Sequence, residues 1–162
     1  MAIATAMGTA FKSEVLKATH NFSASGGNSF KLALYAISSG GKSSSTAALG
    51  ATTVVFTTLG EVASSGTYVT GGLALTNIDP TTAGTTGFAD FADKSFTTAT
   101  ITARGAMIYN DTNGDKMVAS LDFGGNKTST AGTFTIQFQQ QRHLQQLLEL
   151  RKGLKFDFNC WI

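Results

Sequence analysis

The chain has 162 residues, a formal net charge of +2 and only 14% charged residues, about half of the usual share for a soluble domain. This length is typical of one domain, and the scattered Lys and Arg residues give no basic cluster of the kind that a nucleic-acid groove needs. A single cysteine, Cys160, excludes an internal disulfide framework and a cysteine-based zinc site.

The first predicted element is a helix within residues 5–22. Phe11, Val15, Ala18 and Phe22 recur at spacings of four, three and four, which places them on one helical face. His20 lies near the C-terminal end of this segment, where the helix dipole favours a cation. A metal or acid–base role for His20 stays open, but the pattern favours an ordinary residue at a helix end.

The strongest strand signal is FKLALYAI at residues 30–37. Both of its alternating faces are apolar, so we expect a strand at the centre of a sheet. Residues 38–46 have the composition of a surface loop. Residues 52–58, TTVVFTT, predict another strand because β-branched and aromatic residues dominate them.

Further strands are predicted on both sides of the single proline. Gly71-Gly72 marks a bulge or turn before a strand at residues 73–78. Pro80 is expected to end this strand because it has no N–H for a ladder. Residues 88–93 then alternate Phe with Asp in a pattern that suits a short edge strand.

Residues 96–138 predict three consecutive antiparallel strands with period-2 alternation. Asn113-Gly114 supplies the residues of a tight hairpin turn, and Gly124-Gly125-Asn126 is expected to make the second reversal. Together the patterns predict an all-β fold, an antiparallel β-sandwich or partly open barrel of about seven to eight short strands with one N-terminal helix. We expect residues 1–138 to form this single domain.

Two polar features are candidates for a site. Asp111, Asn113 and Asp115 place alternating oxygen ligands in a short loop that could hold Ca²⁺, although the loop is shorter than an EF-hand loop and lacks its terminal Glu. A polar hairpin tip is the alternative, and the Asn-Gly pair favours it.

Arg104 lies inside a predicted strand, where a half-buried guanidinium needs a partner. A contact between subunits and an internal pair with Asp90 or Asp93 are both open. The carboxylates and the two histidines form no pattern for a catalytic pair or triad. We therefore expect no enzyme, no catalytic residue and no cofactor.

Three segments carry a resemblance to a known family. They are Gly66-x-Tyr68-x-x-Gly71-Gly72, Thr102-Ala103-Arg104-Gly105-Ala106-x-Ile108-Tyr109-Asn110 and Thr133-Phe134-Thr135-Ile136-Gln137-Phe138. Over about residues 1–138 the chain resembles small β-rich virion structural proteins of tailed bacteriophages, which are similar to capsid decoration proteins.

The resemblance implies a protein of the virion, assembled in the cytoplasm of a bacterial host. It implies contacts with the major capsid protein or other virion proteins and with copies of itself. Scattered Lys and Arg residues predict no contact with nucleic acid, and the lack of an apolar run of about 20 residues predicts none with a membrane. Arg104, Tyr68 and Tyr109 are the interface candidates. A tail or fibre component that binds a receptor or glycan is the alternative, which exposed aromatic residues and a Ca²⁺ loop would favour.

The chain departs from this resemblance directly after Phe138. The family continues with a Pro-Thr-Ala segment and an ending of the type Ala-Ile-Ile-Arg-Ile, whereas this chain continues QQQRHLQQLLELRKGLKFDFNCWI. Gln codons read one base earlier give Thr or Ala, so a shifted frame permits the family's ending. Residues 139–162 are therefore interpreted as an out-of-frame tail, and a genuine partner-binding helix around residues 144–151 is the alternative.

Overall fold

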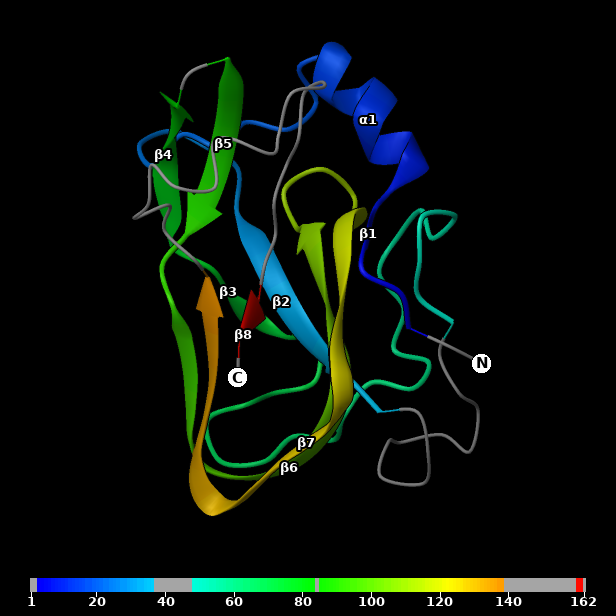
Figure 1. Ribbon diagram of the computed structural model, residues 1–162, viewed down its shortest axis with the longest axis vertical. Helices are drawn as coiled ribbons and strands as arrows, with labels where there is room; N and C mark the ends of the chain where they lie inside the picture. Colours follow the sequence, from blue (N-terminus) through cyan, green and yellow to red (C-terminus); the bar gives the residue numbers. More distant parts are fainter. Residues whose placement is uncertain (1–2, 37–47, 84, 139–159, 162) are drawn as a thin grey trace.

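The computed structural model describes residues 3–36, 48–83, 85–138 and 160–161 (Figure 1). These residues form one helix and eight strands, and every strand pair is antiparallel. The elements are β1 (Ala6–Met7), α1 (Thr9–Leu16), β2 (Phe30–Tyr35), β3 (Leu73–Ala74), β4 (Asn77–Ala83), β5 (Thr86–Phe91), β6 (Lys94–Asn110), β7 (Lys116–Phe138) and β8 (Cys160–Trp161). The predicted all-β fold with one N-terminal helix is confirmed.

The strands form one large sheet and one small sheet. The large sheet has the order β1-β7-β6-β2-β3, with β8 paired to the far end of β7, and β4 and β5 form a separate two-stranded sheet. The large sheet does not close on itself in the described residues, because β1 and β3 lie at its two ends.

A single long hairpin, β6–β7, stands where three strands were predicted. The pairing runs from Asn110↔Lys116, next to the turn, to Lys94↔Ile136. The expected hairpin turn is confirmed, since Gly114 adopts φ +70° between the two strands. The second predicted turn is wrong, because β7 runs without a break through Gly124, which has φ +71°, and stays paired with β6 on both sides of it.

A large bulge explains this difference. Between the pairs Gly105↔Asp122 and Ala103↔Lys127, β6 advances two residues while β7 advances five. The extra residues of β7 bend the hairpin instead of ending the strand. Figure 1 shows both strands turning together at the foot of the molecule. The rings of Phe123 and Phe134, which lie on β7, have centroids 6.4 Å apart.

We call residues 105–110 with 116–122 the proximal half of the hairpin, and residues 94–103 with 127–138 the distal half. The proximal half lies in the middle of the large sheet, with β2 on one side and β1 on the other. The distal half extends beyond both of these neighbours.

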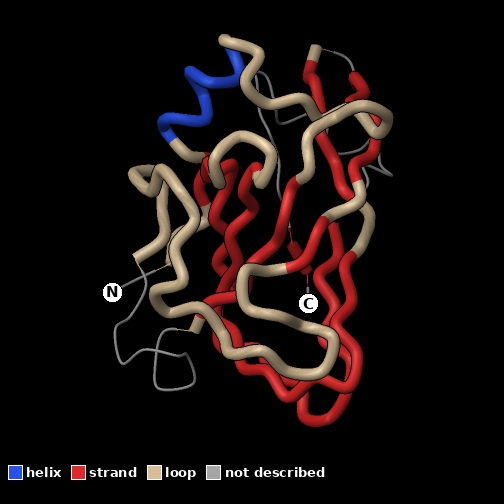
Figure 2. The backbone as a smooth tube through the Cα atoms, turned by 180° about the vertical axis from the view of Figure 1, so that it is seen from behind, coloured by secondary structure: helices blue, strands red, loops and turns tan. Residues whose placement is uncertain are grey.

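Apolar side chains cover both faces of β2, as predicted for a central strand. Phe30, Leu32 and Leu34 belong to the main core. The opposite face carries Ala33 and Tyr35, which pack with residues of β6, β7 and the 48–60 segment in a second cluster. Seen from behind, loops lie across this second face of the sheet (Figure 2).

The helix is shorter than predicted. It ends at Leu16, and Ala18 adopts φ +55°, which turns the chain away from the helix axis. Phe11 is fully buried on α1 as expected, whereas Phe22 is buried beyond the helix and Leu16 is 86% exposed. The backbone reversal at Ala18 therefore directs His20 and Phe22 into the core by a route that helical spacing does not describe.

Two strand predictions need correction. Residues 52–58 form no strand, only a bridge between Val55 and Lys116, and Val54 and Val55 are about half exposed. Pro80 does not end its strand, because β4 runs from Asn77 to Ala83. The register of β4 against β5 shifts between Ile78 and Thr81, so Pro80 sits in an irregularity where no ladder N–H is required.

Several predictions lie outside the described residues. These are the loop at residues 38–46 and, apart from residues 160–161, the expected reading-frame change with its alternative helix. Within the tail, β8 pairs with Gln137 and Phe138 of β7.

Candidate functional site

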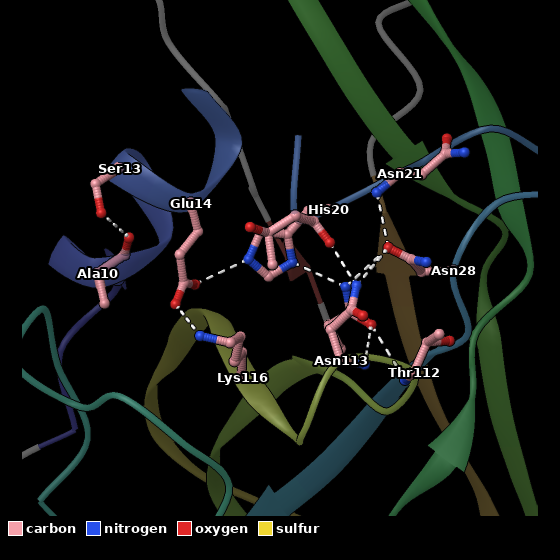
Figure 3. Close-up of polar contacts among 11 residues, drawn as sticks. Ala10, Ser13, Glu14, His20, Asn21, Asn28, Thr112, Asn113 and Lys116 are labelled. Carbon is pink, nitrogen blue, oxygen red and sulfur yellow. Dashed lines mark hydrogen bonds and ion pairs between the residues drawn. The ribbon is translucent and has the colours of Figure 1, made fainter. Parts of the chain in front are cut away.

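A buried polar cluster joins α1 to the tip of the β6–β7 hairpin (Figure 3). It consists of Glu14 on α1, His20 after the helix, Asn28 before β2, Asn110 at the end of β6, Asn113 in the hairpin turn and Lys116 at the start of β7. The cluster brings together residues that are up to 102 positions apart in the sequence. We call it the polar cluster.

Hydrogen bonds fix the tautomer of His20. The Asn110 side-chain oxygen accepts from the backbone N–H groups of Thr112 and Asn113, at 3.1 and 3.2 Å. The Asn110 amide nitrogen must therefore donate to His20 Nδ1, 2.9 Å away. His20 Nε2 then carries the proton and donates to Glu14 Oε2 at 3.0 Å.

The Glu14–His20 pair resembles the carboxylate–histidine pair of a general base, but the second ring nitrogen of His20, Nδ1, already accepts a hydrogen bond from Asn110. The His20 side chain has no exposed surface, and its ring packs at 4.8 Å from Phe11. In a general base that nitrogen would face a substrate, whereas here it accepts from Asn110. The metal or acid–base interpretation of His20 thus receives no support, and the residue does not lie at a helix end either, because α1 ends at Leu16. His20 connects the helix segment to β6.

Glu14 is held by two donors. Burial by itself raises the pKa of Glu14, but the hydrogen bonds and charges of Lys116 and His20 outweigh burial and hold this pKa below its ordinary value. Lys116 Nζ contacts Glu14 Oε1, while His20 holds Oε2. Glu14 is therefore an ionised carboxylate that ties α1 to β7.

Two of the three candidate Ca²⁺ ligands, Asp111 and Asn113, have separate partners. Asp111 accepts from Lys31 Nζ at 2.7 Å, and the Asn113 amide nitrogen donates to Thr19 O and to Asn28 Oδ1. Asp115 adopts φ +55° beside Gly114. Among the described residues, no group of three or more His, Cys, Asp or Glu side chains is placed to hold a metal ion. The loop acts as the polar hairpin tip that was the alternative.

Two of the three interface candidates are buried inside the chain, which corrects their expected place on the surface. Tyr68 has no exposed surface; its hydroxyl donates to Glu61 Oε1 at 2.8 Å and accepts from the Leu34 N–H at 2.9 Å. Tyr109 is 2% exposed and donates to Gly71 O. Burial raises the pKa of both phenols well above the ordinary tyrosine range.

The same contacts explain the glycine-rich motif at residues 66–72. Glu61 Oε1 also accepts from the Gly71 N–H at 2.6 Å. A Cβ on Gly72, which has φ +73°, would lie 2.3 Å from Leu32 O. The motif therefore fixes the chain between β2 and β3 in this structure, through its buried Tyr68 and Gly72.

Arg104 has a different partner from either of the two expected. Its Nε lies 3.0 Å from Asp122 Oδ1, across the hairpin on β7, and Nη2 donates to Asp122 Oδ2 at 3.3 Å. Asp90 and Asp93 are not its partners. Both side chains of the pair are about one quarter exposed, so the guanidinium lies at the surface beside the β7 bulge.

The distal half of the hairpin presents a row of hydroxyl groups to solvent. Thr102 and Thr128 bond across the strands at 3.0 Å, and Ser95 and Thr135 do so at 2.9 Å. None of residues 124–133 is buried. This surface has no charged residue between Thr128 and Phe138.

Sequence reasoning missed the polar cluster and Glu61. Local spacing carries no signal for a contact such as His20 with Asn110, which spans 90 positions. The only available sign was a concentration of Asn around the turns at residues 21–28 and 110–113.

The comparisons with known proteins give no identification. No protein-family model matches the sequence, and neither a curated protein nor a solved structure matches it. In the part of the chain that the structure describes, no helix is long and apolar enough to span a membrane.

Proposed function

We propose that this chain is a structural protein of a tailed-bacteriophage virion, acting as a capsid decoration or cement protein. The observation that carries the proposal is the outward face of the distal half of the hairpin, which is rich in hydroxyl groups and is uncharged over residues 128–138. Such a surface suits many modest contacts, and repetition over a lattice multiplies their effect. The resemblance over residues 1–138 to phage virion proteins is the reason for placing this surface on a virion.

The polar groups support a mechanical role in this proposal. Glu14, His20 and Asn110 are engaged with one another, and Tyr68 is engaged with Glu61. These hydrogen bonds tie α1 to the end of β6 and the turn at Tyr68 to β2. The proposed partners are the major capsid protein or other virion proteins and further copies of this chain, assembled in the host cytoplasm, without a catalytic step, nucleic acid or membrane.

The tail or fibre alternative would be favoured by exposed aromatic residues and a Ca²⁺ loop. Tyr68 and Tyr109 are buried, and Asp111 pairs with Lys31. These described residues therefore give no specific reason to prefer a receptor- or glycan-binding module.

The position of the protein in the particle tests the proposal. Purified virions would be imaged by electron microscopy with a gold-labelled antibody against this chain, and its copy number measured against the major capsid protein by quantitative mass spectrometry. We expect label over the whole head and a copy number that follows the capsid lattice. Label confined to the tail, or no chain in the particle, would overturn the proposal.

Particles assembled without this chain give a second measurement. If it cements the head, such particles should release their DNA at a lower temperature than complete particles, and added purified protein should restore the difference. Unchanged heat release would remove the cement role.

A further inference from the structure

The tip of the β6–β7 hairpin contains an Asn-Gly pair, Asn113-Gly114, which has a chemistry of its own. The backbone nitrogen of a glycine can attack the side-chain amide carbon of a preceding asparagine, because glycine has no Cβ to obstruct the close approach. Asn113 is half-buried, whereas Gly114 is exposed and a Cβ built on it would meet nothing within 4 Å. Water therefore reaches the glycine at the tip, while the asparagine faces the polar cluster.

Two hydrogen bonds hold the side-chain amide of Asn113 in that cluster. Its Nδ2 donates to the backbone O of Thr19 and, at 3.2 Å, to Asn28 Oδ1 (Figure 3). A backbone carbonyl accepts hydrogen bonds and cannot donate them, so the contact with Thr19 assigns the amide nitrogen of Asn113 without ambiguity. The fold thus requires a donor at this position.

The neighbouring Asn28 has the opposite requirement. Its Oδ1 accepts from the Asn21 N–H at 2.8 Å, from Asn110 Nδ2 at 3.0 Å and from Asn113 Nδ2 at 3.2 Å. Three donors converge on one oxygen, so the fold requires an acceptor here. The same chemical change, replacement of an amide by a carboxylate, should therefore have opposite consequences at the two positions.

We propose that Asn113 is a deamidation site which the polar cluster protects. In this reaction the Gly114 nitrogen attacks Cγ of Asn113, a new N–Cγ bond forms, and the Cγ–Nδ2 bond breaks. Nδ2 leaves as ammonia, taking up the proton that the Gly114 nitrogen loses. Water then opens the cyclic imide and leaves aspartate or isoaspartate. The Asn113 amide must leave both of its acceptors to react, so the two hydrogen bonds slow the first step.

Deamidation would disconnect the hairpin tip from the segment that follows α1. The product carries an oxygen where Nδ2 stood, and this oxygen would face Thr19 O and Asn28 Oδ1 without a donor between them. A link between residues 94 positions apart in the sequence would be lost. The modification is irreversible, so each opening of the cluster carries a risk of permanent loss.

The rate of deamidation in the folded and the unfolded chain is the first test. The purified full-length protein would be kept at mildly alkaline pH, with and without guanidinium chloride, and peptide mass spectrometry would follow the mass change at Asn113. We expect the folded chain to react at least about tenfold more slowly, because two hydrogen bonds must break first. Equal rates would overturn the protection.

Two substitutions of Asn28 separate the polar cluster from the fold as a whole. Asn28→Ala removes an acceptor of Asn113 Nδ2 and should raise the deamidation rate of the folded chain several-fold. Asn28→Asp keeps an oxygen at this place and should leave the rate low. With circular dichroism showing both variants folded, an unchanged rate in Asn28→Ala, or equal rates in the two, would overturn the role of the cluster. If Asn28→Ala does not fold, Asn28→Asp must still react as slowly as the unchanged chain.

The effect of the product is tested with Asn113→Asp, for which Asn28→Asp is the matched control. Both substitutions replace an amide by a carboxylate within the same cluster. Asn113→Asp should lower the folding equilibrium constant at least about tenfold in chemical denaturation, whereas Asn28→Asp should leave it the same or higher, because three donors already surround Oδ1. Equal losses in both variants would overturn the proposed consequence.

Discussion

The two halves of the β6–β7 hairpin belong to the same two strands but have opposite environments. In the proximal half, every residue of β6 from Gly105 to Asn110 is buried, with β2 and β1 on its flanks. In the distal half, burial alternates: Phe96, Ala99 and Ile101 face the core while the threonines between them face solvent. The proximal half is buried on both faces because Leu49 and Phe56 pack on its second face, whereas the second face of the distal half meets solvent.

Polar groups follow the same division. In the proximal half the buried Ser120 hydroxyl donates to Ala4 O at 2.6 Å, and buried Asn110 is held within the polar cluster. In the distal half, Thr102 and Thr128 bond to each other at the surface, where water also satisfies them. A substitution that leaves a polar group without its hydrogen-bond partner should therefore lower the free energy of unfolding in the proximal half and change it little in the distal half.

The largest contrast is expected between Ile108→Ala and Thr128→Ala. Ile108 has no exposed surface, and its truncation should lower the free energy of unfolding by about 2–5 kcal/mol because it leaves a cavity. Thr128 is exposed, and its truncation should change this free energy by no more than about 0.5 kcal/mol. Chemical denaturation measures both, and equal losses would contradict the division.

Gly66→Ala should weaken the turn at residues 65–68, which is hydrogen-bonded to Thr97 and Thr100 along the β6 edge of the distal half. Gly66 has φ +57°, and a Cβ there would lie 2.2 Å from Thr97 O. We expect a loss of about 1–3 kcal/mol in the free energy of unfolding, because the backbone conformation disfavours a side chain and the turn must move. Gly87→Ala is the control, since a Cβ at Gly87 meets nothing within 4 Å; a similar loss there would refute the explanation.

Tyr68→Phe tests the anchor between that turn and β2. The change removes the acceptor of the buried Leu34 N–H and a donor to Glu61, so a loss of about 1–2 kcal/mol is expected. Tyr35→Phe removes one hydrogen bond, to Thr57 O at 2.6 Å, and should cost less. Thermal unfolding of both variants compares them, and the reverse order would show that the anchor is unimportant.

The polar cluster predicts a dependence of stability on pH at the proximal end. Because the folded-state pKa of Glu14 is lowered from 4.5, its contribution is present above that value and is lost as the pH falls through the lower folded-state pKa. Glu14→Gln should flatten the decline of the unfolding free energy at acid pH. In Lys116→Met, which loses one of the two donors to Glu14, the folded-state pKa of Glu14 lies closer to its ordinary value, so the decline should be smaller and should end at a higher pH. Identical profiles for all three proteins would exclude Glu14 as the cause.

The smallest effect is expected for Arg104 and Asp122, at the bend between the two halves. Both are partly exposed, so water screens their attraction, and a double-mutant cycle with Arg104→Met and Asp122→Asn should give a coupling of about 0.2–1 kcal/mol. Raised salt should reduce the coupling. A coupling several times larger would mean that the pair holds the bend in place.

Some elements follow from the sequence because their cause is local. Apolar residues on both faces of FKLALY, at every position except Lys31, require cover on both faces, and β2 receives it. The Asn113-Gly114 pair supplies a positive φ, and the hairpin turn forms there. Alternation along residues 96–138 correctly indicates strands and an all-β fold, because it reports which side chains avoid water.

Other features depend on contacts that local patterns do not contain. Gly124 could begin a turn or bend a strand, and the pairing of β7 with β6 on both sides of it decides for a bend. Neighbours in space likewise place Tyr68 and Tyr109 in the interior and give Arg104 its partner Asp122. The sequence by itself thus determined the fold class and the central strand, through hydrophobic periodicity and turn chemistry. Only the tertiary structure decided the bend of the hairpin and the polar cluster, because each depends on which distant segments come to lie beside one another.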